Sequence, residues 1–148
     1  MSATQIKSLY IPYIPSYNTA EDVRGVFQHL QIGSEPLHQF VAKKVQSWNQ
    51  NKNCGLVVGA TDIEELKILR QVIPDMPFLV PGVGAQGGNL KEVLEFGRDK
   101  DGLGLLINVG RDILYQDSGK DFAQKSKQRA QEYVNEMSSL IRTGWNYL

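Results

Sequence analysis

A chain of 148 residues, with 41% hydrophobic and 22% charged residues, is long enough to bury one hydrophobic core and has the composition of a soluble globular protein. Its 16 basic and 16 acidic side chains give a formal net charge of zero, which argues against a general nucleic-acid-binding protein. The single cysteine, Cys54, excludes an intrachain disulfide and favours a reducing, cytoplasmic setting. No apolar stretch is long enough to span a membrane, and the N-terminus lacks the apolar core of a signal peptide.

The amino-terminal part of the chain predicts little regular structure. Residues 1–22 form an irregular segment, because two prolines and a polar stretch interrupt their apolar residues. Residues 23–32 predict a strand, and the stretch 33–36 begins a helix, with its proline near the first turn. Five apolar side chains then follow at helical spacing: Leu37, Phe40, Val41, Val45 and Trp48.

Two complete strand–helix units follow. Residues 54–58 are an apolar run short enough for a strand buried on both faces, and the apolar run 78–80 predicts the next short strand. Thr61 or Asp62 is expected to cap the helix after the first run, and Asn89 the helix after the second, which ends at Gly97. The apolar stripes of these helices are Ile63, Leu66, Leu69 and Ile73, then Leu90, Val93, Leu94 and Phe96.

A last unit consists of a strand over residues 103–109 and a helix over about 121–142. The apolar side of that helix is predicted to carry Phe122, Ala130, Val134, Met137 and Ile141. Strand, loop and helix thus recur about four times at spacings near 25 residues, which predicts one α/β domain with parallel strands. Right-handed crossovers bring the carboxyl ends of parallel strands to one edge, where ligands bind, so Gly82 and Gly110 should face the same space.

A glycine-rich loop joins the strand at 78–80 to the next helix. In Pro81–Gly88, backbone N–H groups can approach an anion closely, and the dipole of the following helix favours negative charge. Gln86 is the only long polar side chain there, and its amide can donate and accept hydrogen bonds at once. The loop is not a phosphate loop with Lys-Ser/Thr, and a flexible surface loop without a ligand explains the pattern equally well.

The next strand ends in Asn108–Arg111, a stretch that favours a phosphate site. The planar, permanently charged guanidinium of Arg111 suits a phosphate group. A solvated arginine beside a turn is the alternative, but two such strand ends in consecutive units favour phosphate. In barrels of eight strands, the last two strand–helix loops frequently form that site.

Three stretches, residues 55–61, 78–88 and 104–115, strongly resemble the last three strand–loop units of orotidine 5′-phosphate decarboxylases. The resemblance covers roughly residues 33–142, is best to the bacterial and protozoan branch, and is carried most specifically by the string Pro81–Gly88. It implies the C-terminal half of a TIM (β/α)8 barrel, over residues 23–148. It also implies a cofactor-free conversion of orotidine 5′-phosphate (OMP) to UMP in pyrimidine synthesis, by an enzyme that is usually a homodimer.

The resemblance also implies roles for single residues. Gln86 matches the glutamine that spans the phosphate and the pyrimidine carbonyl, and Arg111 matches the arginine that pairs with the phosphate. Gly110 and Gly87 line the same pocket, and Pro81 matches the proline beside the base. Thr61 lies at the matching Gly-Ala-Thr strand end, but no ligand contact is carried over to it.

The catalytic array of the family, Asp-x-Lys-x-x-Asp, does not occur in this sequence. The stretches 99–101 and 117–121 have the right residue types at the wrong spacing. The family's Thr-Ser-Asn stretch is replaced by residues 29–34, which puts contacts from that loop in doubt. We therefore assign no catalytic residue.

The remaining reactive side chains predict structural roles. His29 and His38 are expected to be structural, and Cys54 is expected to be a small core residue rather than a reactive thiol. One cysteine and two separated histidines do not form a zinc site.

Two classes of function remain open. The chain is either the phosphate-binding half of a decarboxylase, active only when another chain supplies the first half of the barrel, or a nucleotide-phosphate-binding or structural module without activity. A remnant without a ligand is a third possibility. The implied ligands are phosphate and nucleotides of the UMP or OMP type. Because a half-barrel leaves strand edges and an apolar face open, we expect a homo-oligomer or a complex with an N-terminal half-barrel.

Overall fold

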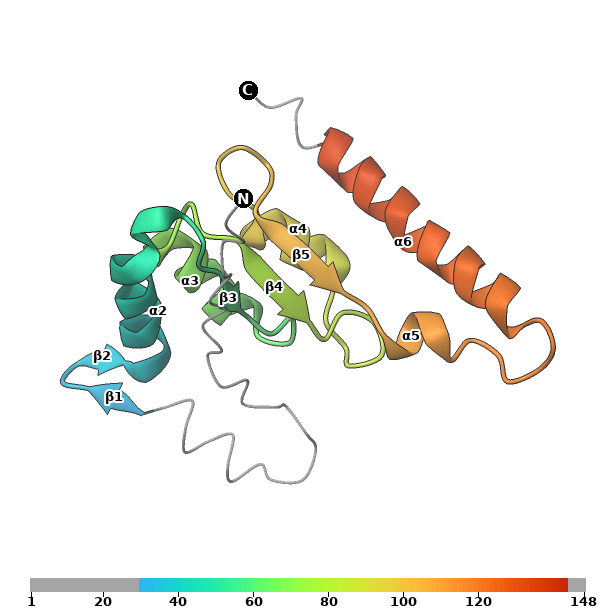
Figure 1. The fold of residues 1–148 in the computed structure, drawn as a ribbon, viewed down its shortest axis with the longest axis horizontal. Coiled ribbons are helices and arrows are strands. Elements are labelled where there is room, and N and C mark those ends of the chain that lie inside the picture. Colours follow the sequence, from blue (N-terminus) through green and yellow to red (C-terminus); the bar gives the residue numbers. More distant parts are fainter. Residues whose placement is uncertain (1–29, 144–148) are drawn as a thin grey trace, which may run out of the picture.

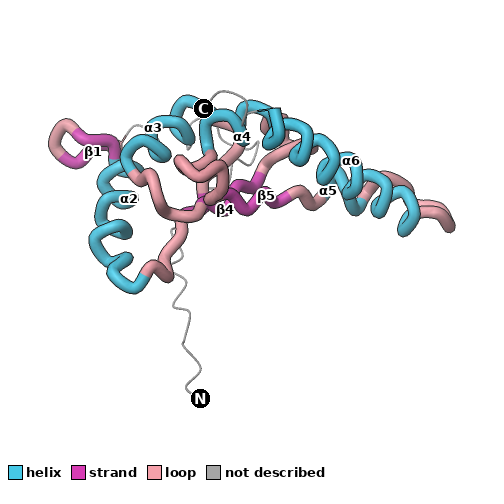
Figure 2. Tube along the Cα trace, turned by 90° about the horizontal axis from the view of Figure 1, so that it is seen from above, coloured by secondary structure: helices cyan, strands magenta, loops and turns pink. Residues whose placement is uncertain are grey.

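The centre of the molecule is a parallel three-stranded sheet. The computed structural model describes residues 30–143, with side chains up to residue 141. The sheet has the order β3–β4–β5, with β3 at Leu56–Val57, β4 at Phe78–Pro81 and β5 at Leu105–Asn108. Helices α3 (Ile63–Val72) and α4 (Leu90–Gly97) lie on one side of it, with α2 (Leu37–Trp48) beside α3 and α6 (Phe122–Thr143) beside α4 (Figures 1 and 2). Two one-turn helices, η1 (Asn49–Asn51) and α5 (Arg111–Leu114), follow α2 and β5.

The strand expected over residues 23–32 does not join the parallel sheet in the part of the chain that the structure describes. Residues 1–29 lie outside that part. Gln31–Ile32 (β1) pairs antiparallel with Glu35–Pro36 (β2) around Gly33, whose φ of 66° fits a tight turn. The described residues contain three parallel strands of the about four predicted, and most of the remaining one, over residues 23–32, lies outside the described range. The helix expected to begin within residues 33–36 begins at Leu37, directly after Pro36.

The parallel register brings the carboxyl ends of the strands to one edge, as predicted. Leu56 and Val57 pair with Phe78 and Leu79, and Pro81 pairs with Asn108. Beyond the end of β3, the backbone N–H of Ala60 still donates to the carbonyl oxygen of Pro81, at 2.9 Å. The segments that follow the three strands therefore start side by side.

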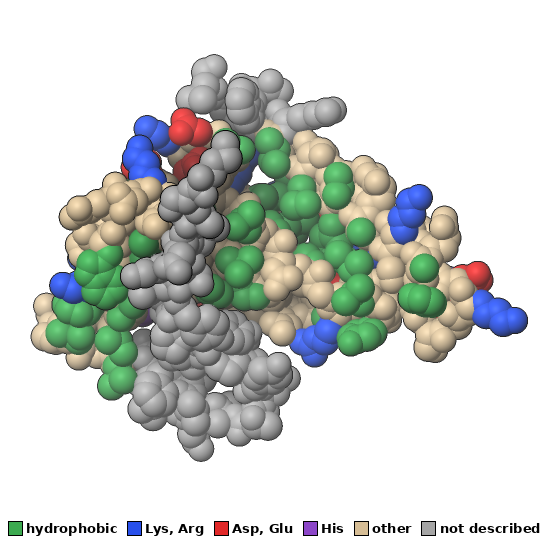
Figure 3. All heavy atoms as spheres, viewed as in Figure 1, with side chains coloured by type: hydrophobic (Ala, Val, Ile, Leu, Met, Phe, Trp, Pro, Cys, Tyr) green, Lys and Arg blue, Asp and Glu red, His purple; other side chains and the backbone are tan. Residues whose placement is uncertain are grey.

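Side chains alternate between the two faces of the sheet. Phe78 and Val80 are fully buried under the helices, whereas Leu79 between them is 40% exposed. On β5, Leu105 and Ile107 pack against the core, and Leu106 is 62% exposed. Burial on both faces was predicted for the strand at residues 54–58, but in β3 only Leu56 is buried and Val57 is partly exposed. Figure 3 shows hydrophobic side chains gathered over β5 and along α6 on the other face.

Both helix caps expected in the complete units are present. The side chain of Asp62 accepts a hydrogen bond from the backbone N–H of Glu65 at 3.1 Å, so Asp62 is the cap of α3. The side chain of Asn89 accepts from the N–H groups of Lys91 and Glu92. Capping depends on residues within one turn, which explains why local sequence predicts it.

The apolar stripes predicted for the first and last helices are partly wrong. In α2 the core side chains are Ala42 and Val45, while Trp48 is 53% exposed. In α6, Phe122 is 55% exposed and Val134 is also exposed. The buried residue of α6 is Tyr133, with Met137 and Leu140 packed beside the core. Compared with the prediction, the helix is thus rotated about its axis so that the hydroxyl of Tyr133, rather than a purely aliphatic stripe, faces the loop at the carboxyl edge of the sheet.

A buried arginine ties together the opposite end of the sheet. The Arg70 guanidinium, 7% exposed, lies 3.7 Å from the ring centroid of Phe78. It donates hydrogen bonds to five backbone carbonyl oxygens: those of Ile73, Pro74, Met76, Gly97 and Gly104. Burial lowers the pKa of Arg70 from its ordinary value, although Asp99 and Asp75 oppose this shift. The guanidinium thereby links α3, the end of α4 and the segment before β5.

Candidate functional site

The candidate site lies at the carboxyl edge of the sheet, where a glycine loop and the start of α5 meet. The loop follows β4 over residues 82–88, and α5 follows β5 directly. A Cβ placed on Gly84 would lie 3.1 Å from the Cβ of Asp112, so the two segments are in contact. Gly82 and Gly110 therefore belong to neighbouring segments at one edge, as the repeat of strand and helix predicted.

Three internal hydrogen bonds close the glycine loop. The N–H groups of Gly84, Gly87 and Gly88 donate to the carbonyl oxygens of Gly88, Gly84 and Gly82, at 3.2, 2.8 and 3.0 Å. Gly82, Gly84 and Gly87 have φ values of 100°, 80° and 89°, a region that side-chain-bearing residues rarely adopt. The loop is thus a preformed turn.

Close packing also requires glycine at position 88. A Cβ on Gly88 would lie 2.5 Å from the Cβ of Ala60 and 2.6 Å from the carbonyl oxygen of Gly82. By contrast, nothing lies within 4 Å of a Cβ placed on Gly87. The loop is therefore pressed against the end of β3 at one point and open to solvent at another.

The hydrogen bonds of the loop limit which of its groups are available to an anion. The N–H groups of Gly84, Gly87 and Gly88 are already used within the turn. Likewise, the side chain of Asn89 accepts from the first N–H groups of α4. The glycine content alone suggested a row of open N–H groups, but the loop offers fewer of them to an anion, because three already donate within the turn.

Gln86 and Arg111 are both exposed at this edge. The side-chain oxygen of Gln86 lies 3.1 Å from the position of a Cβ on Gly82, so the amide is folded back over the end of β4. Arg111 is the first residue of α5, after Gly110, whose carbonyl oxygen accepts from Ile113 and Leu114. The structure thus places the long polar side chain and the guanidinium on adjoining segments.

Pro81 and Asn108 are the last residues of β4 and β5, at the same edge of the sheet. They pair across β4 and β5, and both continue the alternation of Leu79 and Leu106 toward the open face. Sequence reasoning assigned no role to Asn108. The alternation of side chains along the strand could have indicated its position, because Asn108 lies two residues after Leu106 and therefore on the same face.

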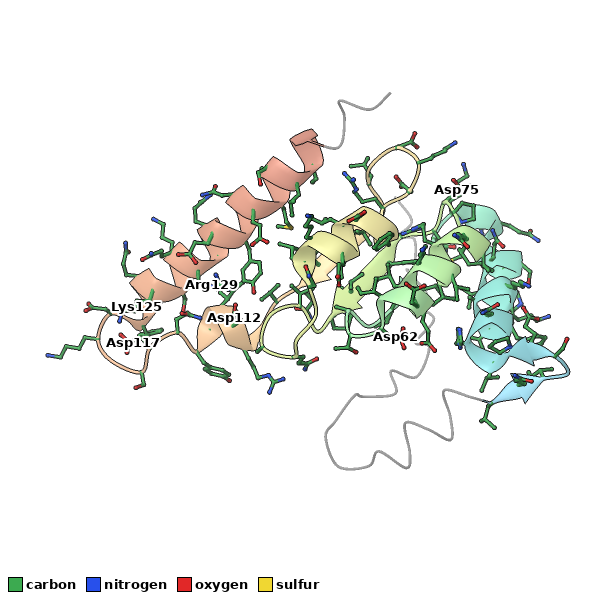
Figure 4. All side chains as sticks on the ribbon, turned by 180° about the vertical axis from the view of Figure 1, so that it is seen from behind. Asp62, Asp75, Asp112, Asp117, Lys125 and Arg129 are labelled. Carbon is green, nitrogen blue, oxygen red and sulfur yellow. The ribbon has the colours of Figure 1, made fainter. Side chains whose placement is uncertain are left out.

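A cluster of three polar side chains adjoins the loop and α5. The carboxylate oxygen Oδ2 of Asp112 accepts from Tyr133 Oη at 2.6 Å and from Arg129 Nη2 and Nε at 2.7 and 2.9 Å. Figure 4 shows Asp112 and Arg129 pointing toward one another between α5 and α6. Sequence analysis missed this cluster, because its members lie 17 and 21 residues apart and follow no motif.

The hydrogen bonds in this cluster set its charges. The pKa of Asp112 is lowered, first by the hydrogen bond from Tyr133 and then by that from Arg129. Burial and the neighbouring carboxylate raise the pKa of the Tyr133 hydroxyl. The pKa of Arg129 is raised by Glu132 and Asp112. At neutral pH the cluster is therefore a carboxylate held by a guanidinium and a neutral phenol.

The acidic and basic stretches considered in the sequence have local structural roles. Asp99 accepts hydrogen bonds from the N–H groups of Asp101 and Leu103 in the turn before β5, at the end of the sheet remote from the glycine loop. Asp117 accepts from the N–H of Gly119 and pairs with Lys125 at 3.2 Å. Neither stretch lies in the candidate site.

The histidines and the cysteine that the sequence offered as candidates lie outside the candidate site where the structure describes them. Nδ1 of His38 lies 4.0 Å from a carboxylate oxygen of Glu65, and His29 lies outside the described residues. Cys54 is half-buried and packs on the core. Within residues 30–143, no group of three histidine, cysteine or acidic side chains is arranged to hold a metal ion. No helix in this range has the length and apolarity needed to cross a membrane.

A parallel sheet with helices against one face, and with a glycine loop and an arginine after adjacent strands, defines an α/β protein of repeated strand–helix units. The chain is homologous to orotidine 5′-phosphate decarboxylases. It is 49% identical over 128 residues to that enzyme from Dehalococcoides mccartyi, covering 86% of this chain and 47% of the relative. The enzyme from Janthinobacterium is 47% identical over 106 residues, or 71% of this chain and 39% of the relative. No protein-family model matches the sequence.

Solved structures give the same result. The OMP decarboxylase of Leishmania donovani superposes with a TM-score of 0.69 at 36% identity, covering 82% of this chain and 45% of that one. The UMP synthase of the same organism gives a TM-score of 0.71 at 39% identity, covering 83% and 26%. The chain thus spans less than half the length of the curated relatives and solved structures named here.

Proposed function

We propose that this chain carries the phosphate-binding part of an orotidine 5′-phosphate decarboxylase site. The observation that supports this most is the contact between the closed glycine loop and the start of α5, which brings Gln86 and Arg111 to one edge of the sheet. The guanidinium of Arg111 would pair with the phosphate, since arginine binds phosphate oxygens through two parallel hydrogen bonds.

The other residues of the site would shape the pocket for a nucleotide. Gln86 would span the phosphate and the pyrimidine carbonyl, because an amide donates and accepts at once. Pro81 would lie beside the base. Gly87 and Gly110 would admit the phosphate closely, because a Cβ at either position would meet only open space. The ligand would thus be UMP or OMP, and we propose no cofactor.

The decarboxylation itself would need residues that this sequence does not contain. General acid catalysis requires a positioned proton donor, and the Asp-x-Lys-x-x-Asp array of the family is absent. We therefore propose that the chain alone binds the nucleotide without converting it. The alternative, a binding or structural module without any reaction, rests on the same geometry and differs only in whether a completing partner exists.

The open face of the sheet supports a completing partner. Leu79 and Leu106 are exposed there, although strands of a parallel sheet are normally covered on both faces. A half-barrel that supplies the remaining strands would bury them and add the catalytic array, and self-association of two copies would cover the same surface. We also propose a cytoplasmic setting, supported by the single cysteine.

A decarboxylation assay beside a binding measurement tests this proposal. The pure chain should bind UMP in calorimetry and show no conversion of OMP above background. Addition of an N-terminal half-barrel from a homologous decarboxylase should restore turnover. Turnover by the chain alone would show that a proton donor was overlooked, and absence of UMP binding would remove the phosphate site.

A further inference from the structure

Tyr133 of helix α6 contacts both segments of the candidate site. It is 6% exposed, and its hydroxyl donates to Asp112 Oδ2 at 2.6 Å. A Cβ placed on Gly84 would lie 2.5 Å from the same hydroxyl oxygen. One polar atom of α6 therefore rests against the glycine loop and holds the residue that follows Arg111.

Arg129, one turn earlier on α6, holds the same carboxylate. Its Nη2 and Nε both donate to Asp112 Oδ2, and its guanidinium lies 4.6 Å from the ring centroid of Tyr133. Its other arm, Nη1, donates to Glu132 at 2.9 Å. A single carboxylate oxygen thus receives three donors, all of them from α6.

The segment that these contacts hold has little stability of its own. Helix α5 is only four residues long, and a single helical turn does not form without support from its surroundings. Arg111 and Asp112 are its first two residues. The backbone that carries Arg111 is consequently fixed through the side chain of Asp112, while the hydroxyl of Tyr133 limits the movement of Gly84.

We propose that Asp112, Arg129 and Tyr133 form a clasp that positions Arg111 and the glycine loop for an anionic ligand. These are positioning residues, since they act on the ligand only through the two segments that they hold. The clasp makes the anion site depend on helix α6, which itself contributes no ligand-binding residue. Its ligand role rests on the proposed phosphate site, whereas its effect on the backbone does not.

The test uses the full chain with two conservative variants and one matched control. Tyr133→Phe removes only the hydroxyl, and Asp112→Asn removes the charge at nearly constant size. Glu132→Gln removes the other carboxylate partner of Arg129 and leaves Asp112 in place. Each protein is titrated with UMP by calorimetry, and amide hydrogen exchange is measured for residues 82–88 and 110–114.

The clasp predicts linked changes in both measurements. Tyr133→Phe and Asp112→Asn should accelerate exchange in both segments and weaken UMP binding about threefold to tenfold, the effect of one lost hydrogen bond. Glu132→Gln should change neither. In an Arg111→Ala background, Asp112→Asn should no longer weaken binding, because the residue through which it acts is gone. A merely structural contact would not give this dependence.

The outcomes separate the clasp from the proposed function. Unchanged exchange in residues 82–88 and 110–114 of both variants would overturn the clasp, whatever the affinity. Faster exchange with unchanged UMP affinity, or an undiminished effect in the Arg111→Ala background, would overturn its positioning role. If the wild-type chain fails to bind UMP at all, the phosphate site and the ligand part of the inference both fall, and exchange alone decides whether the clasp exists.

Discussion

Replacing Arg70 by methionine should destabilise the fold more than any surface substitution. Methionine fills a similar volume but donates no hydrogen bonds. The two shortest hydrogen bonds of Arg70, from Nε to the Gly97 carbonyl at 2.6 Å and from Nη1 to the Met76 carbonyl at 2.7 Å, would be lost. The Gly104 carbonyl would keep a partner, because it also accepts from the backbone N–H of Phe78.

The expected loss follows from these two bonds. A hydrogen bond to a charged group contributes about 1.5–3 kcal/mol, so two of them give a loss of about 3–6 kcal/mol in the free energy of unfolding. That is a large share of the roughly 5–15 kcal/mol by which domains are stable. Arg70→Lys should lose less, because it keeps the charge without the planar fork.

Urea unfolding followed by circular dichroism measures this loss. Lys91→Met, on the exposed side of α4, is the control and should change the free energy of unfolding by less than about 0.5 kcal/mol. A loss below about 1 kcal/mol for Arg70→Met, with an unchanged denaturant slope, would refute the reasoning. It would mean that the carbonyl oxygens find water or other donors when the guanidinium is removed.

Three further predictions concern the glycine loop, the clasp and the open face. Gly84→Ala should destabilise the protein by about 1–3 kcal/mol more than Gly87→Ala, because both residues have positive φ but only an alanine at 84 meets the Tyr133 hydroxyl; equal losses would contradict this. The lowered pKa of Asp112 stabilises the fold above its unfolded pKa of about 4, and this contribution is lost as the pH falls through the folded value. When the free energy of unfolding is measured at decreasing pH, it should therefore decline less steeply for Asp112→Asn than for the wild type. The pKa of Asp117 is also lowered, so only the difference between the two proteins reports on Asp112. Parallel curves would show that Asp112 does not contribute to the acid sensitivity. In sedimentation at micromolar concentration the chain should not be a free monomer, and a sharp monomer with little binding of apolar dyes would show that the open face is covered from within.

The features predicted correctly from sequence are those that neighbouring residues determine. Caps at Asp62 and Asn89 act within one helical turn, and the apolar runs at β4 and β5 are continuous. The glycine loop and Arg111 were found because each directly follows such a run. Their contact then follows from the parallel order of the strands.

The features that were missed depend on contacts between distant parts of the chain. The antiparallel pairing of Gln31–Ile32 with Glu35–Pro36 is an exception, because the turn at Gly33 sets it locally, whereas the apolar pattern over 23–32 suggested a parallel strand. Tyr133, rather than an aliphatic stripe, faces inward because its hydroxyl donates a hydrogen bond to Asp112, 21 residues away. Arg70 has acceptors up to 34 residues distant, and no local pattern indicates a buried charge.

The binding of UMP to the wild-type chain and to Arg111→Ala tests the central claim most directly. Isothermal titration of the full chain should show UMP binding that Arg111→Ala weakens about tenfold or more, since a charge-assisted contact contributes about 1.5–3 kcal/mol. Gln86→Ala should weaken UMP binding more than phosphate binding, because it loses the contact to the base. Lys100→Ala, an exposed cation at the far end of the sheet, should leave both affinities unchanged. Equal affinities for the wild type, Arg111→Ala and Gln86→Ala would contradict the account and remove this edge of the sheet as a phosphate site.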